Sequence, residues 1–241
     1  MPKIPKVPSE IFGEFSDDMK SVFETDLISI ILYGSAAKGD YVYRKSDINF
    51  LIILTETGIK SIDRTFDLLK KWRKRAVTTP LFLTPEYIKS SLDSFPLEFW
   101  DMQKYHQIVY GEDLLRGLEI RRSDLRLQCE REIKGKLLHL RQNFLNSEKK
   151  AERLRSLLVY SVPSFSTIFN ALLFLKNETA QHSRRDIFSN TAKIFGLDRE
   201  VFEKILRLRY EKLKLKKDEL LPLTRAFIEE IRKLSQLVDQ L

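Results

Sequence analysis

Residues 32–40 read LYGSAAKGD and residues 46–53 read SDINFLII. The first stretch ends a short apolar run, residues 27–33, whose length and β-branched residues are typical of a buried strand. This run stops at Gly34, and a glycine at the end of a strand lets the backbone come close to a ligand. The two stretches therefore predict two buried strands joined by a polar connection that starts at a glycine.

The residues after Gly34 predict a phosphate-binding turn. Ser35 begins what reads as one short helical turn, which Gly39 closes. Backbone N–H groups exposed at the start of such a turn bind phosphate oxygens, and the Ser35 hydroxyl adds a further donor. Lys38 supplies a positive charge to the same place. We therefore expect Gly34, Ser35 and Lys38 to form a nucleotide-binding element.

The second stretch places polar side chains on one face of a strand. Because side chains alternate along a strand, Asp47 and Asn49 share one face, and Ile48 and Phe50 share the other, which should be core. Two acidic side chains spaced by two on a strand form a platform for Mg²⁺ bound to a nucleoside triphosphate. Asp47 fits the first position as a metal ligand and catalytic residue, whereas Asn49 places an amide in the second.

These residues resemble the nucleotidyltransferases of the DNA polymerase β superfamily, most closely the small bacterial branch that includes antibiotic and minimal nucleotidyltransferases. The family pattern is a strand, Gly-Ser, a short helix and then Ser-Asp-x-Asp entering a second strand. The motif match covers residues 27–54. The resemblance implies that Gly34 and Ser35 bind phosphate, that Asp47 binds Mg²⁺, and that a helical domain follows.

The chain departs from that family at two of its three carboxylates. Asn49 stands where the family has its second acid, and the strand expected at 77–84, which corresponds to the strand of the third acid, contains none. An amide oxygen is a neutral and weaker metal ligand than a carboxylate. Other acids would have to replace the missing ones in space, and the first to consider are Glu56, Glu86, Glu98 and Asp101. We therefore expect Mg-nucleotide binding to survive better than catalysis.

The hydrophobic pattern predicts an α+β protein of two domains. Residues 1–120 read as a mixed-sheet nucleotidyltransferase-like domain, and residues 121–241 as an all-α helical bundle of about five helices. Specific expectations follow for the individual segments. They are a helix capped by Ser9, strands at 46–54, 76–84 and 107–111, a helix at 59–74 that buries Ile59, Ile62, Phe66, Leu69 and Trp72, short helices starting at Pro85 and Pro96, a kink or break at Pro163, a helix capped by Asp198, and Pro222 in the first turn of the last helix.

Composition and charge indicate which partners, metal sites and cellular location to expect for this protein. The 241 residues carry a net charge of +8, which favours anionic partners such as nucleotides or nucleic acid, or equally reflects solvated basic helix faces. The only cysteine, Cys129, excludes an internal disulfide and a cysteine-based zinc site. Without an apolar run of about 18 residues, no membrane span is expected, and a cytoplasmic protein is the natural prediction.

Two other features are weaker candidates for function. The basic run Lys70–Arg75, which includes Trp72, would suit nucleic-acid phosphates but more simply ends a solvated helix. His106, His139 and His182 lack the spacing of metal ligands.

The sequence leaves two functional interpretations open. The first is a nucleotidyltransferase-fold protein that binds a Mg-nucleoside triphosphate, with an unknown small-molecule or protein acceptor and weakened catalysis. The alternative is a regulatory module that binds nucleic acid or protein without nucleotide chemistry.

Overall fold

The computed structural model describes residues 3–181 and 183–241, which form two compact units, the first ending at Ile120 and the second running from Arg121 to Leu241. His182 lies outside the described residues. The first unit is α+β and the second is helical, so the predicted fold class is confirmed.

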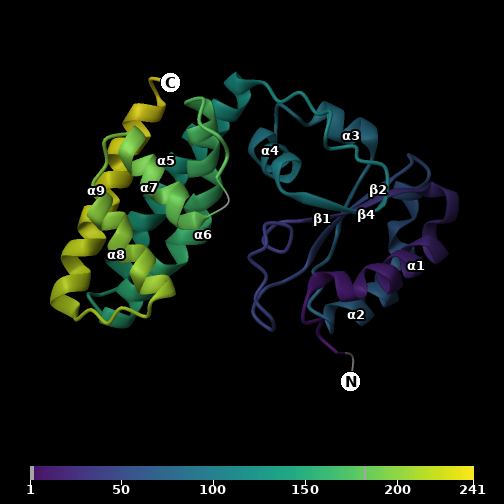
Figure 1. The fold of residues 1–241 in the computed structure, drawn as a ribbon, viewed down its shortest axis with the longest axis horizontal. Helices are drawn as coiled ribbons and strands as arrows, with labels where there is room; N and C mark the ends of the chain where they lie inside the picture. The colour runs from purple at the N-terminus through teal and green to yellow at the C-terminus, as the bar shows by residue number, and fades with distance from the viewer. Residues whose placement is uncertain (1–2, 182) are drawn as a thin grey trace. The chain divides into compact units, whose positions relative to one another are not determined.

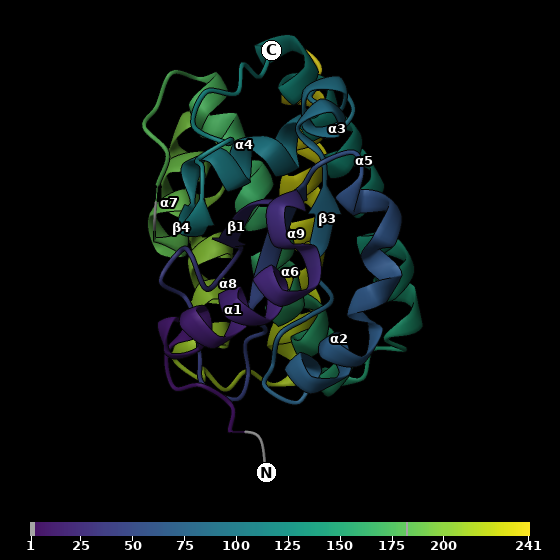
Figure 2. The same cartoon turned by 90° about the vertical axis from the view of Figure 1, so that its right-hand side faces the viewer.

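The first unit is built on a four-stranded mixed sheet with the order β3-β2-β1-β4. β1 runs antiparallel to β2 and β4, while β2 runs parallel to β3. Figure 2 shows β4 and β3 on opposite sides of β1. The strands are β1 (Leu27–Tyr33), β2 (Asn49–Leu54), β3 (Leu81–Leu83) and β4 (His106–Gly111).

Helices cover both faces of this sheet, as Figure 1 shows. On one face, Phe15 of α1 and Trp72 of α2 pack with Phe50 of β2. On the other face, Phe99 of α4 packs with Leu51 of β2. The helices of this unit are the 3₁₀-helices η1 (Pro8–Ile11), η2 (Glu24–Asp26) and η3 (Gly58–Thr65), and the α-helices α1 (Phe12–Phe23), α2 (Phe66–Arg73), α3 (Pro85–Ser90) and α4 (Pro96–Lys104).

The second unit is a bundle in which α6 contacts α5, α7, α8 and α9. By length and composition α6 would cross a membrane, but most of its apolar stretch is buried inside the unit, as expected for the core helix of a bundle. Buried Cys129 lies on α5 as a small core side chain. The helices are α5 (Arg122–Asn146), α6 (Ala151–Leu175), α7 (Arg184–Ile194), α8 (Arg199–Tyr210) and α9 (Lys217–Val238).

Two prolines lie inside helices of the second unit. Of the kink or break expected at Pro163, the break is absent, because helix α6 continues through this residue. A proline lacks an N–H, so the carbonyl of Val159 four residues earlier loses its usual donor. The Arg209 guanidinium supplies one instead, with its Nη1 3.0 Å from that carbonyl oxygen. Pro222 lies in the second turn of α9 instead of the first, because the helix begins at Lys217.

The first unit also corrects several predicted boundaries. Pro8 opens a 3₁₀ turn that includes Ser9, so Ser9 does not cap the α-helix, which begins at Phe12. The predicted helix at 59–74 starts as 3₁₀-helix η3. Three residues per turn instead of 3.6 shift the apolar positions, and Ile62 and Phe66 are consequently exposed.

The third predicted strand is much shorter than expected. Only Val77 pairs with Ile48, in an isolated bridge, and pairing resumes at β3. Pro80 lies between the two paired segments and has no N–H to donate to a neighbouring strand. β3 lies at an edge of the sheet, where a proline is tolerated.

Candidate functional site

The site predicted from the sequence lies where β1 ends and β2 begins. These two points meet because the strands are antiparallel and Tyr33, the last residue of β1, pairs with Asn49, the first residue of β2. The next residue after β1, Gly34, and the residue before β2, Ile48, therefore lie at the same end of the sheet. The turn that follows Gly34 and the Asp47 side chain are brought to one end of the sheet.

The turn after β1 is one hydrogen-bonded loop and not a regular helix. The Lys38 amide donates to the Gly34 carbonyl at 3.1 Å, and the Asp40 amide donates to the Ser35 carbonyl at 2.9 Å. Gly34 and Gly39 have φ values of +74° and +81°, a region that non-glycine residues rarely adopt. A glycine at each end therefore allows the chain to reverse within six residues.

Three consecutive amides in this turn are free. Within residues 3–181 and 183–241, the N–H groups of Ser35, Ala36 and Ala37 donate no hydrogen bond. Residues 34–38 of the turn are partly exposed. Successive free N–H groups in a tight turn form a concave patch of positive partial charge, which is an environment suited to an anion.

Asp47 lies just before the first bridged residue of the strand. It is exposed, and in the described part of the chain its carboxylate has no hydrogen bond or ion pair. No group of three or more His, Cys, Asp or Glu residues in that part is arranged to hold a metal ion. Asp47 is therefore a single available carboxylate beside the turn, suited to a cation that arrives with most of its ligands already supplied.

Asn49 is held by its neighbours. The Thr78 hydroxyl donates to its Oδ1 at 2.8 Å. A Cβ placed on Gly34 would lie 3.0 Å from its Nδ2, so the amide also packs directly against the turn. The Asn49 side chain thus connects β2 with the turn and with the segment before β3. Thr78 was not among the residues singled out from the sequence.

Next to Asn49, the sheet presents Tyr33 of β1 and His106 of β4. Tyr33 pairs with both Asn49 on β2 and His106 on β4, and it packs against the apolar cluster under α4. Burial raises the pKa of the Tyr33 phenol above its ordinary value. The His106 ring is bound by the Met102 carbonyl and by Asp113, so it takes a structural role on this side.

The Lys38 ammonium is held in an ion pair with a residue of α4. Its Nζ lies 2.6 Å from Oδ1 of Asp101 on α4, and also 5.0 Å from the centre of the Tyr105 ring. Asp101, one of the four acids considered as substitutes for the missing carboxylates, is thus tied to the turn by an ion pair. Nothing in the sequence alone connects two residues 63 positions apart.

Two residues of the basic run 70–75, Lys71 and Arg75, form ion pairs with acidic residues of α1. Lys71 lies 3.0 Å from a Glu14 oxygen and 2.6 Å from an Asp18 oxygen, and Arg75 also pairs with Glu14. The hydrogen bonds donated by Arg75 and then by Lys71 lower the pKa of Glu14, and the hydrogen bonds that Lys71 donates to Asp18 and then to Glu14 raise the pKa of Lys71. Trp72 is buried and donates to Asp18. The Trp72 ring is therefore buried, and the charges of Lys71 and Arg75 are already paired within the first unit.

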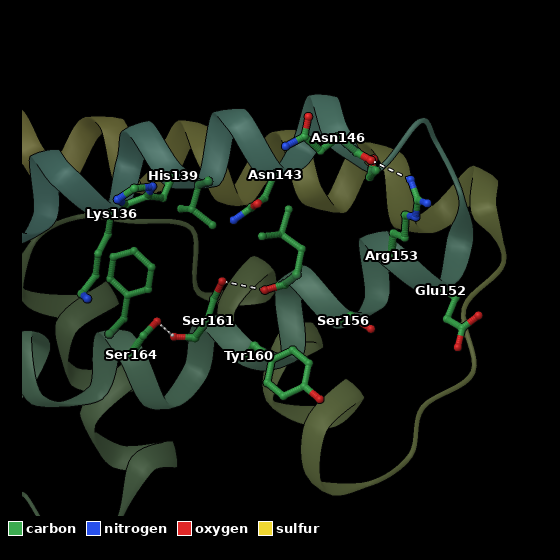
Figure 3. A pocket seen from close by; sticks show the side chains of 14 residues that line it. Lys136, His139, Asn143, Asn146, Glu152, Arg153, Ser156, Tyr160, Ser161 and Ser164 are labelled. Carbon is green, nitrogen blue, oxygen red and sulfur yellow. Dashed lines mark hydrogen bonds between the residues drawn. The ribbon is translucent and has the colours of Figure 1, made fainter.

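The second unit contains a cavity of about 680 Å³ between α5 and α6. Figure 3 shows side chains of both helices around it, with His139 and Asn143 from α5 and Tyr160 and Ser164 from α6. Lys136, Arg153 and Glu152 also line it, so its formal charge is slightly positive. Hydroxyl, amide and aromatic groups together are suited to a small hydroxylated molecule.

No family model matches this sequence, and no curated protein matches it either. The structure is similar to that of spectinomycin adenyltransferase AAD(9) from Enterococcus faecialis, solved with ATP and spectinomycin, with a TM-score of 0.55. The match covers 93% of this chain and 99% of that chain at 12% sequence identity. At such low identity the likeness shows the fold alone. The chain has the fold of a nucleotidyltransferase with a helical C-terminal part.

Proposed function

We propose that the first unit is a nucleotide-binding domain that takes a Mg-nucleoside triphosphate at the turn after β1. The phosphates would accept hydrogen bonds from the free amides of Ser35, Ala36 and Ala37, and Asp47 would hold the metal that travels with them. The observation that carries this proposal is the set of three free amides beside an unpaired carboxylate. Mg²⁺ in such sites keeps phosphate and water ligands and needs only one or two carboxylates.

We further propose that nucleotidyl transfer by this protein is weakened. Asn49 brings no negative charge, and its carbonyl oxygen already accepts a hydrogen bond from Thr78. The segment 77–84, which corresponds to the strand of the third acid in the family pattern, contains no acid. When bound, Mg²⁺ would neutralise the triphosphate, but activation of an attacking hydroxyl normally relies on further carboxylates. Binding is thus favoured over catalysis.

The helical unit is proposed to hold the acceptor. The neighbour AAD(9) was solved with spectinomycin, and by analogy the cavity between α5 and α6 is the natural place to look for a small-molecule acceptor here. Lys136 and Arg153 in its lining are ion-paired with Glu132 and Glu148, and Glu152 also lines the cavity, so these charges do not select the charge of an acceptor. Membership of the antibiotic-modifying branch stays a prediction, and the acceptor is a small molecule or a protein. A cytoplasmic location belongs to the same proposal, because nucleoside triphosphates are supplied there.

The alternative, a module that binds nucleic acid or protein without nucleotide, receives less support. One of its arguments was the basic run Lys70–Arg75, in which Lys71 and Arg75 are paired with Glu14 and Asp18 and Lys70 is paired with Asp67. These carboxylates compete with nucleic-acid phosphates for three of the five basic groups of the run, and phosphate contacts dominate the affinity for a nucleic acid.

Thermal unfolding with ATP, GTP, CTP and UTP, with and without Mg²⁺, tests the proposal. At about 100 times its dissociation constant, a ligand of the folded state adds about 2.7 kcal/mol to stability, so at least one nucleotide should raise Tm by several degrees. Asp47→Ala should remove the part of the shift that depends on Mg²⁺. Asp63→Ala, which deletes an exposed carboxylate elsewhere in the first unit, should leave the shift unchanged. If no nucleotide shifts Tm in either condition, the proposal fails.

A further inference from the structure

We propose that Asp101 competes with the nucleotide phosphates for Lys38 and thereby sets the nucleotide affinity of the site. This inference rests on the proposed function, because it concerns how the same turn receives its ligand. It makes Asp101 a positioning residue, which acts on the ligand through the lysine. No part of the family pattern requires an acid at this place on α4.

The ion pair joins the turn to the helix that covers the same face of the sheet. Lys38 Nζ lies 2.6 Å from Asp101 Oδ1, and the two side chains are 20% and 17% exposed. α4 packs through Phe99 and Met102 against the face that carries Leu51 of β2, which is also the face of Asn49. Asp101 is therefore held in place by a packed helix, whereas Lys38 extends from a loop.

Partial burial makes this pair stronger than the exposed pairs of the same unit. In the pair Lys70–Asp67 the side chains are 69% and 95% exposed, and water and salt screen their attraction. Around Lys38 and Asp101 less water is available, and the Tyr105 ring lies 5.0 Å from the ammonium. Breaking the Lys38–Asp101 contact therefore costs more free energy than breaking an exposed pair.

Lysine is the residue type that permits an exchange of partners. Its ammonium ends a flexible four-carbon stem and has three donors that are not fixed in one plane. The Lys38 backbone is anchored, since its amide donates to the Gly34 carbonyl, so only the side chain has to move. A triphosphate on the free amides of residues 35–37 would offer several anionic oxygens within reach of that side chain.

Asp101 then weakens nucleotide binding in two ways. The ligand must first take Lys38 away from a carboxylate at 2.6 Å, and the released carboxylate afterwards stays near the phosphates and repels them. The second effect acts whether or not residue 38 is a lysine, but the first requires the lysine. The two effects can be separated by measuring the Asp101 substitution with and without Lys38.

The test is calorimetric titration of the full chain with ATP, in the presence and absence of Mg²⁺. Asp101→Asn should bind ATP about fivefold more tightly than wild type in both conditions. In a Lys38→Met background the same substitution should change the affinity less than about twofold, because only screened repulsion remains. Asp67→Asn, which removes the same charge from an exposed pair, should leave the affinity unchanged. Unfolding curves of each variant confirm that the first unit stays folded.

The outcomes separate this inference from the proposed function. If wild type and all variants fail to bind ATP, both are overturned. If wild type binds ATP and Asp101→Asn binds it equally or more weakly, the competition is wrong while the nucleotide site stands. A loss of affinity in Asp101→Asn that appears only with Mg²⁺ would make Asp101 a metal ligand and would also overturn the competition. If Asp101→Asn raised the ATP affinity by the same factor in the Lys38→Met background, the effect of Asp101 would be repulsion alone, and the competition for Lys38 would be overturned.

Discussion

Gly34→Ala should lower ATP affinity at least tenfold and destabilise the first unit by about 2 kcal/mol. Gly34 has a φ of +74°, and a side chain in that conformation costs roughly 1 kcal/mol or more. The new Cβ would also lie 3.0 Å from Asn49 Nδ2. Asn49 would have to move, and its hydrogen bond with Thr78 would be strained. The turn would then lose the arrangement that leaves its amides free.

Gly39→Ala is the matched control for this substitution. Gly39 has a similar φ of +81°, but no atom lies within 4 Å of the position its Cβ would occupy. It should show the backbone cost alone, about 1 kcal/mol, without displacing Asn49. Urea unfolding gives the stability of each variant, and calorimetry gives its ATP affinity. If Gly34→Ala bound ATP as tightly as wild type, the phosphates would have to lie somewhere other than this turn.

Asn49→Asp should produce the largest gain of function, a Mg²⁺-dependent ATP affinity at least tenfold higher than that of wild type. The Thr78 hydroxyl that donates to Asn49 Oδ1 can donate equally to a carboxylate oxygen, so the new side chain keeps its support. The other oxygen would replace Nδ2 beside the turn. Together with Asp47 it would restore the pair of carboxylates that the family pattern has on this strand.

Transfer of radiolabel from α-labelled ATP, to water or to the protein itself, measures the catalytic side of this prediction. Weak activity should appear in Asn49→Asp and vanish in the double variant Asp47→Ala with Asn49→Asp. Wild type should show little or none. If wild type transferred the label and Asp47→Ala abolished the transfer, the proposal of weakened nucleotidyl transfer would be contradicted. Asn49 would then be sufficient for catalysis in the place of the second acid.

Local sequence patterns predicted the elements whose formation depends on neighbouring residues. The strand at 27–33 is observed with the same ends, because an apolar β-branched run bounded by a glycine leaves little choice. α3 begins at Pro85, and the Thr84 hydroxyl accepts from the Tyr87 amide, a start that proline and threonine favour together. The helix before α2 was predicted less well. Its 3₁₀ geometry changes which residues face the core, and the apolar spacing alone does not reveal that change.

The candidate site was predictable only where the chemistry is local in sequence. The spacing of Gly34, Ser35 and Asp47 follows from two adjacent strands, and the structure brings those strand ends together. The partners of Asn49 and Lys38 lie 29 and 63 residues away. They are set by the pairing of β2 with the segment before β3 and by the packing of α4. The sequence therefore suggested a free Lys38, which the fold pairs with Asp101.

The most direct test of the central claim is a nuclear magnetic resonance titration of the ¹⁵N-labelled protein with ATP. If the phosphates bind the free amides after β1, the resonances of Ser35, Ala36 and Ala37 should shift most, and Mg²⁺ should extend the shifts to Asp47. Amides of the basic run at the end of α2 should stay unchanged. ATP-induced shifts that spare residues 34–39 and cluster on another surface would contradict the account.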